Sequence, residues 1–297
     1  MRTAAIGIGS NSLRMLVADI SDGKLKRLKR YREGLRVFAA LDENRNILPE
    51  MIRKACESVS AFRTEALECG AEKVHLFATS AVRDAANQRM FADALKDRTG
   101  MELDICSGDE EASLSFWGAA EEGSSGLIDI GGGSTEVAIG CGRDIESAVS
   151  LQMGAVRLFR MHPINCLKDA MDVVEVAEGI IQPAAEKFVP DPQRSWVGVG
   201  GTFTTSAALV QRIPWQNREN IHGFVLTQES VLETLALLAP MSLEERLKLD
   251  CLQPQRADIV VHGIAILLAC MQKLQISSIM VSEYGNLEGY LKYKYLF

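Results

Sequence analysis

Residues 127–136 read Leu-Ile-Asp-Ile-Gly-Gly-Gly-Ser-Thr-Glu, and residues 137–139 continue as Val-Ala-Ile. An apolar run, a turn of glycine and serine, and a second apolar run are typical of two antiparallel strands joined by a tight turn. Glycine leaves the backbone N–H groups of such a turn open to an anion, and hydroxyl groups add further donors. The segment therefore predicts a hairpin whose turn can bind phosphate.

The same pattern occurs near the N-terminus, where residues 4–17 read Ala-Ala-Ile-Gly-Ile-Gly-Ser-Asn-Ser-Leu-Arg-Met-Leu-Val. Aligning the two turns pairs Ser12 with Ser134 and Gly7 with Asp129. One such turn is a weak signal, but two in register indicate an internal repeat. We therefore predict two related lobes that face a cleft and contribute one phosphate loop each. The phosphate-binding residues of these loops are predicted to be Ser10, Asn11, Ser12, Gly131, Gly132, Gly133, Ser134 and Thr135.

Strand-like and helix-like segments alternate along the rest of the chain, which predicts an α/β fold. Apolar residues at helical spacing run from Pro49 to Cys69 and stop before Gly70. The other expected helices cover 87–98, 108–118, 257–274 and the chain from 286 onwards. Further strands are expected at 24–32, 74–78, 103–106 and 279–282, and a third glycine turn at 198–202 precedes a helix that begins near Phe203.

The lobe boundary is predicted at residues 122–126, Glu-Gly-Ser-Ser-Gly, which have the composition of a connector. The first lobe is thus expected to cover residues 1–122 and the second residues 123–285. The terminal helix, 286–297, is expected to pack back on the first lobe.

Composition narrows the class of protein. The 297 residues are 47% hydrophobic and 24% charged, which is ordinary for a globular chain of about two domains. The net charge of −7 argues against general binding to nucleic acid or to anionic membranes, so any polyanion must be held by a local cluster of charge. The apolar run at 259–271 is too short to span a bilayer and predicts a buried helix. No signal peptide is recognisable, so we expect a cytoplasmic protein.

Carboxylates stand at positions suited to phosphate chemistry. Asp129 ends a strand directly before its glycine turn, where a carboxylate can reach Mg²⁺ beside bound phosphates, and Glu136 after the turn could hold a metal-bound water. Glu110 and Glu111 open a helix, and Ser107 three residues before Glu110 predicts a capping box. Because adjacent helical residues point about 100° apart, Glu111 is then left to face a cleft.

Seven segments in this order resemble the exopolyphosphatase/guanosine-pentaphosphate phosphohydrolase family. They are AAIGIGSNSLRMLV, TSAVRDAAN, SGDEEA, LIDIGGGSTE, VGVGGT, HGFVLT and RADIVVHGIAIL, and they cover nearly the whole chain. The resemblance implies two actin-like, ribonuclease H-like lobes in a short form without an additional helical C-terminal region. It places the catalytic base at Glu111, magnesium or water partners at Asp129 and Glu136, and a phosphate contact at Arg83.

The implied activity is hydrolysis of a terminal phosphoanhydride with Mg²⁺ or Mn²⁺ as cofactor. The substrate would be inorganic polyphosphate, pppGpp, which would be converted to ppGpp, or both. Homodimerisation is a further expectation from the family, whereas nucleic acid and membrane are not expected partners.

Two departures from the family pattern bear on this expectation. Gly7 stands where the family usually has aspartate, and the internal repeat independently shows that the twin of Asp129 is missing. Residues 281–289 only approximate the family's pattern near the C-terminus. Gly7 keeps open a second reading, a non-catalytic sensor of polyphosphate or guanosine polyphosphates. The glycine turn at 200–202 keeps open a third, a phosphotransferase of the acetate- or sugar-kinase type.

Residues 24–32 form a basic run, Lys-Leu-Lys-Arg-Leu-Lys-Arg-Tyr-Arg. Such a run is usually the solvated face of a strand, and its functional interpretation is a surface for a long polyanion. This interpretation predicts that the dependence on substrate length falls when Lys26 and Lys29 are neutralised.

Overall fold

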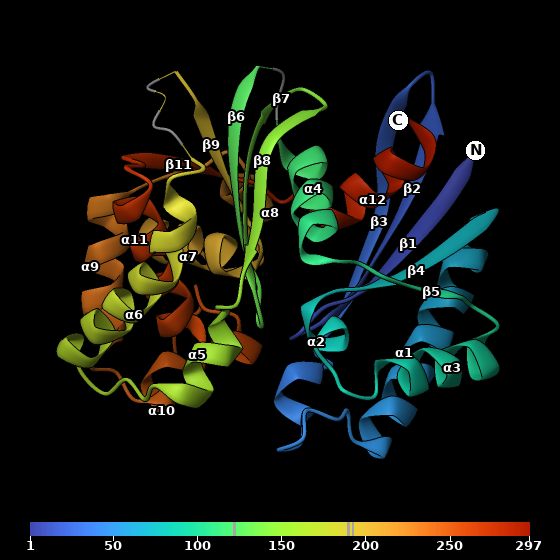
Figure 1. Ribbon diagram of the computed structural model, residues 1–297, viewed down its shortest axis with the longest axis horizontal. Coiled ribbons are helices and arrows are strands. Elements are labelled where there is room, and N and C mark those ends of the chain that lie inside the picture. Colours follow the sequence, from blue (N-terminus) through green and yellow to red (C-terminus); the bar gives the residue numbers. More distant parts are fainter. Residues whose placement is uncertain (121–122, 189–190, 192) are drawn as a thin grey trace. The chain divides into compact units, whose positions relative to one another are not determined.

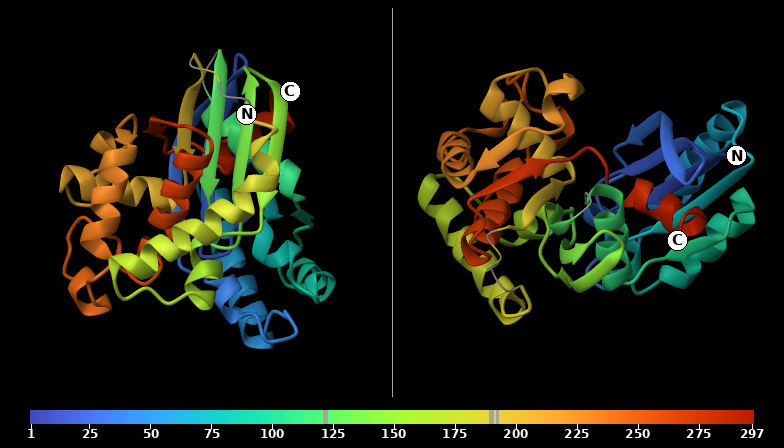
Figure 2. Two further views of the ribbon diagram at one scale, coloured as in Figure 1. Left: turned by 60° about the vertical axis from the view of Figure 1, so that its left-hand side comes forward. Right: turned by 90° about the horizontal axis from the view of Figure 1, so that it is seen from above.

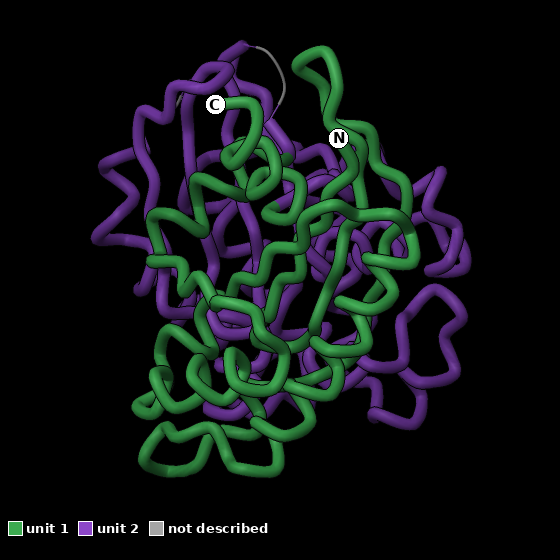
Figure 3. The backbone as a smooth tube through the Cα atoms, turned by 90° about the vertical axis from the view of Figure 1, so that its right-hand side faces the viewer, with its two compact units in different colours: residues 1–118, 286–297 green, residues 119–285 purple. Residues whose placement is uncertain are grey.

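The computed structural model describes residues 1–120, 123–188, 191 and 193–297. It divides the chain into two compact units, shown in Figure 3. Unit 1 contains Met1–Gly118 and Asn286–Phe297, and unit 2 contains Ala119–Gly285. Each unit has its own sheet and its own helices.

Unit 1 is built on a five-stranded sheet with the order β3-β2-β1-β4-β5 (Figure 1). The strands are β1 (Arg2–Ile8), β2 (Leu13–Ser21), β3 (Lys24–Glu33), β4 (Lys73–Ala78) and β5 (Leu103–Ile105). Strands β1, β2 and β3 form an antiparallel meander, whereas β4 and β5 run parallel to β1. The predicted N-terminal hairpin and third strand are confirmed.

Helices cover both faces of this sheet. They are the 3₁₀ turn η1 (Val37–Ala40), α1 (Pro49–Glu68), α2 (Ser80–Arg83), α3 (Gln88–Thr99), α4 (Gly108–Ala119) and α12 (Asn286–Tyr295). Helix α1 begins at the predicted proline and buries its apolar stripe, and its Phe62 contacts Tyr31 of β3. On the other face, Leu287, Tyr290 and Leu291 of α12 pack on β1, β2 and β4.

Unit 2 contains a six-stranded sheet with the order β10-β11-β9-β6-β7-β8. Its strands are β6 (Ser124–Ile130), β7 (Thr135–Cys141), β8 (Asp144–Leu151), β9 (Ser195–Val199), β10 (Val225–Thr227) and β11 (Ser278–Val281). Strands β6, β7 and β8 form an antiparallel meander, and β9 runs parallel to β6. The sheet thus begins with an antiparallel three-stranded meander, as the sheet of unit 1 does.

The helices of unit 2 enclose a large apolar core. They are α5 (Ala155–Met161), α6 (Leu167–Ala185), α7 (Gly201–Gln211), α8 (Arg218–Ile221), α9 (Gln228–Leu238), α10 (Leu243–Arg246), η2 (Pro254–Arg256) and α11 (Val260–Lys273). Every residue of α11 from Val260 to Met271 is buried, as expected for a helix that is apolar on all sides. Helix α11 contacts α5, α6, α7 and α9; the left view of Figure 2 shows α6 as the long yellow-green helix.

Two sequence predictions of element bounds were wrong. The helix expected from Ala257 begins at Val260, because the preceding residues form a turn. In the predicted connector, Ser124, Ser125 and Gly126 extend strand β6, while Glu122 lies outside the described residues. Gly126 serves packing rather than flexibility, since a Cβ atom there would lie 2.5 Å from the Trp196 ring. Among the described helices, none is long and apolar enough to cross a bilayer.

Candidate active-site residues

The two predicted phosphate loops are closed by the same hydrogen bond. In unit 1 the amide of Gly9 donates to the carbonyl of Ser12, and in unit 2 the amide of Gly131 donates to the carbonyl of Ser134; both bonds are 3.0 Å long. A Cβ atom on either glycine would lie within 3.3 Å of its acceptor carbonyl. The repeat seen in the sequence is therefore a repeat of backbone geometry, and glycine avoids a tight contact with the acceptor carbonyl in both copies.

The loop of unit 1 is buried and held by its neighbours. Ser10, Asn11 and Ser12 are each no more than 7% exposed. The Ser10 hydroxyl lies 2.8 Å from the hydroxyl of Ser80 at the start of α2. The carbonyls of Ser10 and Asn11 accept bonds from Phe38 and Arg36, which fixes the peptide planes of the turn.

Glu111 and Arg83 form an ion pair in unit 1. The Arg83 Nη1 atom donates to Glu111 Oε2 at 2.8 Å and to the Cys106 carbonyl at 3.1 Å. Glu111 is only 6% exposed although it lies in the first turn of a helix. Arg83 therefore holds the Glu111 carboxylate, a contact that the sequence did not predict.

The predicted capping role of Glu110 is confirmed. Glu110 Oε2 accepts a bond from the amide of Ser107 at 2.7 Å, and the Glu110 amide donates to the Ser107 hydroxyl at 3.2 Å. These two bonds are a capping box. Glu110 thus caps the N-terminus of α4, and the Glu111 carboxylate pairs with Arg83.

The loop of unit 2 is fixed by the start of α5. The carbonyls of Gly131 and Gly132 accept bonds from the amides of Ala155, Val156 and Arg157, and the Gly133 carbonyl accepts from the Arg157 side chain. Because C=O and N–H point in opposite directions across a trans peptide, the amides of Gly132, Gly133 and Ser134 point away from α5. Successive backbone amides that point out of a turn are suited to an anion.

Asp129 and Glu136 flank this loop on adjacent strands. They are register partners in the β6–β7 pair, and both are at least 92% buried. The Ser150 hydroxyl of β8 donates to Glu136 Oε1 at 2.7 Å. Gly200 leaves room for Asp129, since a Cβ atom at Gly200 would lie 2.9 Å from Asp129 Oδ1. Sequence reasoning missed Ser150 and the contact of Gly200 with Asp129, because both depend on strand register.

The donor set suits a hard divalent cation that keeps much of its water. Two carboxylates side by side favour Mg²⁺ or Mn²⁺. Within the described residues no group of three or more His, Cys, Asp or Glu could hold a metal ion. Asp129, with Glu136 beside it, would therefore hold the ion through a small number of protein oxygens.

Two of these residues have surroundings that the sequence did not predict. The Thr135 hydroxyl, predicted to bind phosphate, is fully buried and donates to the Met153 carbonyl at 2.7 Å, so its proton is engaged inside the fold. Gly7 does not leave an open gap where the family has aspartate. A Cβ atom at Gly7 would lie 2.9 Å from Cζ of Phe77, whose ring stacks on Tyr290 at 4.6 Å.

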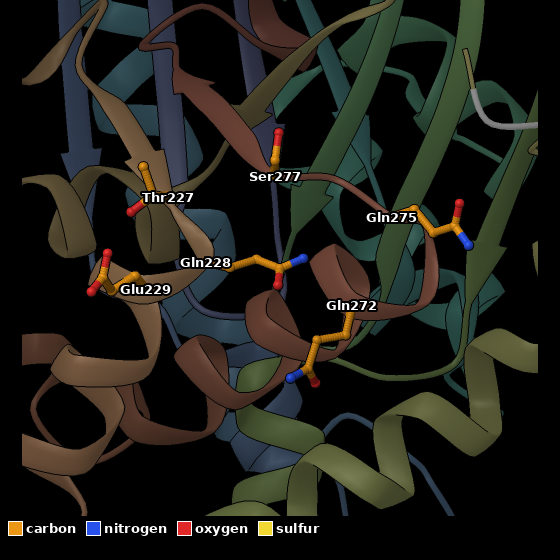
Figure 4. A pocket seen from close by; sticks show the side chains of 6 residues that line it. All are labelled: Thr227, Gln228, Glu229, Gln272, Gln275 and Ser277. Carbon is orange, nitrogen blue, oxygen red and sulfur yellow. The ribbon is translucent and has the colours of Figure 1, made fainter. Parts of the chain in front are cut away.

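A separate depression of about 510 Å³ lies in unit 2, lined by Thr227, Gln228, Glu229, Gln272, Gln275 and Ser277 (Figure 4). It contains none of the predicted site residues. The Gln228 amide donates to the carbonyls of Met271 and Ile276, which ties the start of α9 to the end of α11. Its most central side chain therefore has a structural role.

Known proteins resemble this chain over almost all of its length. The sequence profile of the Ppx/GppA phosphatase family matches residues 16–296. Exopolyphosphatase 2 of Mycobacterium tuberculosis is 31% identical over 97% of each chain. Guanosine-5′-triphosphate,3′-diphosphate pyrophosphatase of Vibrio parahaemolyticus is 29% identical over 96% of this chain, which spans 58% of that relative's length.

Solved structures show the same architecture. The crystal structure of the Aquifex aeolicus member of the Ppx/GppA family matches the whole of this chain and 98% of its own, with a TM-score of 0.84 and 27% identity. An exopolyphosphatase from Cytophaga hutchinsonii, 24% identical, has the same fold with a TM-score of 0.87. The predicted α/β fold with two actin-like lobes is confirmed, and the chain belongs to the Ppx/GppA phosphatase family.

Proposed function

We propose that this protein is a phosphohydrolase that releases terminal orthophosphate from inorganic polyphosphate, converts pppGpp to ppGpp, or does both. The observation that carries the proposal is the pair of glycine-closed loops with identical turn bonds, accompanied by a buried Glu111 in unit 1 and buried Asp129 and Glu136 in unit 2. The functions of the related proteins point the same way.

In this proposal the amides of both loops bind phosphate oxygens, and Glu111 acts as general base. Its carboxylate accepts a proton from water while the water oxygen attacks the terminal phosphorus, and the bond to the bridging oxygen breaks with its electrons leaving on the shortened chain. A bound Mg²⁺ or Mn²⁺ would neutralise charge on the phosphoanhydride. Arg83 keeps the Glu111 carboxylate in one orientation, which is the chief requirement of phosphoryl transfer.

The test compares Glu111→Gln with Glu110→Gln. Purified protein is incubated with Mg²⁺ and either polyphosphate or pppGpp, and released orthophosphate is measured. We expect release by the wild type and by Glu110→Gln, since glutamine also completes a capping box. Release should fall by at least about 100-fold in Glu111→Gln. Equal rates in the two variants would remove Glu111 as the base.

A sensor without turnover is the second candidate, and the packing at Gly7 favours it. Gly7 supplies no carboxylate, and Phe77 occupies the space beside it. Binding of polyphosphate or pppGpp without any orthophosphate release, in Mg²⁺ or in Mn²⁺, would select the sensor. Homodimerisation and cytoplasmic residence remain predictions.

A further inference from the structure

The two hairpins carry opposite charge at equivalent positions. In unit 2, Asp129 of β6 lies opposite Glu136 of β7. The repeat places Gly7 at the position of Asp129, and the register of the β1–β2 pair places Arg14 opposite Gly7. A carboxylate pair in one unit thus corresponds to glycine and arginine in the other.

Further arginines lie beside Arg14 on the sheet of unit 1. Arg14 of β2 lies opposite Arg32 of β3, so the two side chains share one face. Arg14 Nη2 donates to Asn286 Oδ1 at 3.0 Å, which identifies this face as the one that α12 covers in part. Arg30 is two residues from Arg32 and lies on the same face.

An irregularity in the strand adds a fourth arginine. The register of β2 and β3 shifts between Val17 and Ala18, so Leu28 is skipped and Arg27 lies opposite Ala18. Arg27 consequently joins the face of Arg30, and its Nη1 atom lies 3.5 Å from Glu288 Oε1 of α12. We name Arg14, Arg32, Arg30 and Arg27 the arginine row.

The lysines of the same strand do not belong to the arginine row. Lys26 lies opposite Asp19. Lys29 is two residues from Tyr31 and shares its face. The ring and hydroxyl of Tyr31 contact Phe62 and Glu65 of α1. The sequence treated the basic run as one surface, but the structure divides it between two faces. Neutralising Lys26 and Lys29 therefore tests the face opposite the arginine row.

The arginine row begins at the phosphate loop and leads away from it. Arg14 follows the loop residue Ser12 by two positions, and Arg32 lies opposite it. Alternate residues of a strand are about 7 Å apart, so Arg30 and then Arg27 lie progressively farther along the hairpin. Arg30 and Arg32 are exposed, and Arg14 and Arg27 are half-buried.

We propose that the arginine row binds the phosphates of inorganic polyphosphate that follow the terminal phosphate held at Ser10–Ser12. The inference rests on the proposed function and names its substrate class. Like charges directly opposite each other on neighbouring strands are unfavourable, and an anion bound by both guanidinium groups offsets this repulsion. In a chain whose net charge is −7, such a concentration of guanidinium groups provides the local complementarity that a polyanion needs.

Inorganic polyphosphate suits this surface better than a nucleic acid does. Single-stranded nucleic acids bind through basic grooves combined with aromatic side chains that stack on bases. On β3 the aromatic residue is Tyr31, which faces α1. The arginine row thus supplies positive charge for a chain of phosphates, and strand β3, which the structure describes in full, places no aromatic side chain on the same face.

The test uses the full chain with Arg30→Gln/Arg32→Gln, and Lys24→Gln/Lys26→Gln as the control. Both double variants remove two charges from exposed positions of one strand, on opposite faces. Binding of fluorescent long-chain polyphosphate is measured across a range of salt concentrations. The arginine variant should bind about tenfold more weakly, and its slope of log K against log salt should fall by about 1 per arginine removed. The lysine variant should bind like the wild type.

Kinetics separate this inference from the proposed function. The arginine substitutions should raise KM for long-chain polyphosphate at least several-fold more than KM for tripolyphosphate, because a long chain has phosphates for both Arg32 and Arg30 whereas tripolyphosphate extends little beyond the loop. A protein that hydrolyses neither substrate would overturn the proposed function, while the binding comparison would still test the row. Equal weakening in both double variants, or tighter competition by single-stranded DNA of the same charge, would overturn the inference.

Discussion

The Arg83 guanidinium and the Glu111 carboxylate form an ion pair, with 2.8 Å between Nη1 and Oε2. The same Nη1 atom donates to the carbonyl of Cys106, which precedes α4. Arg83 thus connects the end of α2 to the segment that positions the proposed base. Burial also raises the pKa of the Cys106 thiol to about 12, with the charge of Glu111 as the next cause, so that this thiol stays protonated beside the pair.

Arg83→Lys is expected to lower kcat by about 10-fold to 100-fold, because a lysine ammonium cannot reproduce the geometry of the guanidinium and small displacements of a catalytic group are costly. Steady-state kinetics with polyphosphate should separate two roles. A fall in kcat at constant KM indicates that Arg83 positions Glu111, whereas a rise in KM indicates the phosphate contact that the family resemblance implies. Wild-type values of both would exclude either role.

Gly7→Asp is not expected to restore the carboxylate that the family usually carries. The new Cβ atom would lie 2.9 Å from Phe77 and 3.4 Å from Leu287, so the substitution overpacks the core and should destabilise the fold by about 1–3 kcal/mol. Urea unfolding measures the loss, and calorimetric titration with Mg²⁺ measures metal affinity.

Gly7→Asp combined with Phe77→Ala provides the control for this prediction. Removing the ring makes room for the carboxylate, so the double variant should be more stable than the sum of the single effects predicts. Additive losses, or an increased Mg²⁺ affinity in Gly7→Asp alone, would show that Phe77 does not occupy the place of the carboxylate.

The hairpin turns and the capping box could be predicted from the sequence, because each depends only on residues close together in the chain. Both hairpin turns follow from glycine and serine between apolar runs, and their shared turn bond needs no distant residue. The split between Glu110 and Glu111 follows from the capping box and from the 100° step of a helix.

Features that depend on strand register were not accessible from the sequence. Phe77 reaches Gly7 because β4 pairs with β1 across a long connection, and Ser150 reaches Glu136 through the β7–β8 register. The skipped residue Leu28 reverses the alternation of β3, so the basic run could not be assigned to faces in advance. Serine and threonine in a loop look alike in sequence, although the Thr135 hydroxyl is engaged with Met153.

Stability should decrease below about pH 6.5, and His262 is one cause. Burial lowers the pKa of His262 from the ordinary 6.5, even though its Nε2 atom lies 2.7 Å from the His162 carbonyl, and nearby Arg246 lowers it further. Between the lowered and the ordinary pKa the unfolded chain binds more protons than the folded chain, so the free energy of unfolding falls as pH falls and levels off below the folded pKa.

His262→Gln should make this pH dependence shallower, since glutamine can still donate to the His162 carbonyl but does not titrate. Urea unfolding of both proteins between about pH 5 and 7.5 provides the comparison. His75, whose pKa burial also lowers, leaves a residual slope in the variant. Identical pH profiles for the two proteins would show that His262 does not contribute.

Gly154→Ala should displace the phosphate loop of unit 2, although Gly154 is not part of that loop. A Cβ atom at Gly154 would lie 2.5 Å from the backbone of Gly132 and Gly133, so the loop must move and its amides lose their alignment. We expect kcat for orthophosphate release to fall by about 100-fold, together with a loss of about 1–3 kcal/mol in unfolding free energy. Gly179→Ala in α6 is the matched control, because a Cβ atom there meets nothing within 4 Å and a helical alanine should stabilise by about 0.5–1 kcal/mol. If both variants kept full activity, the close approach of Gly154 to the loop would have no part in catalysis.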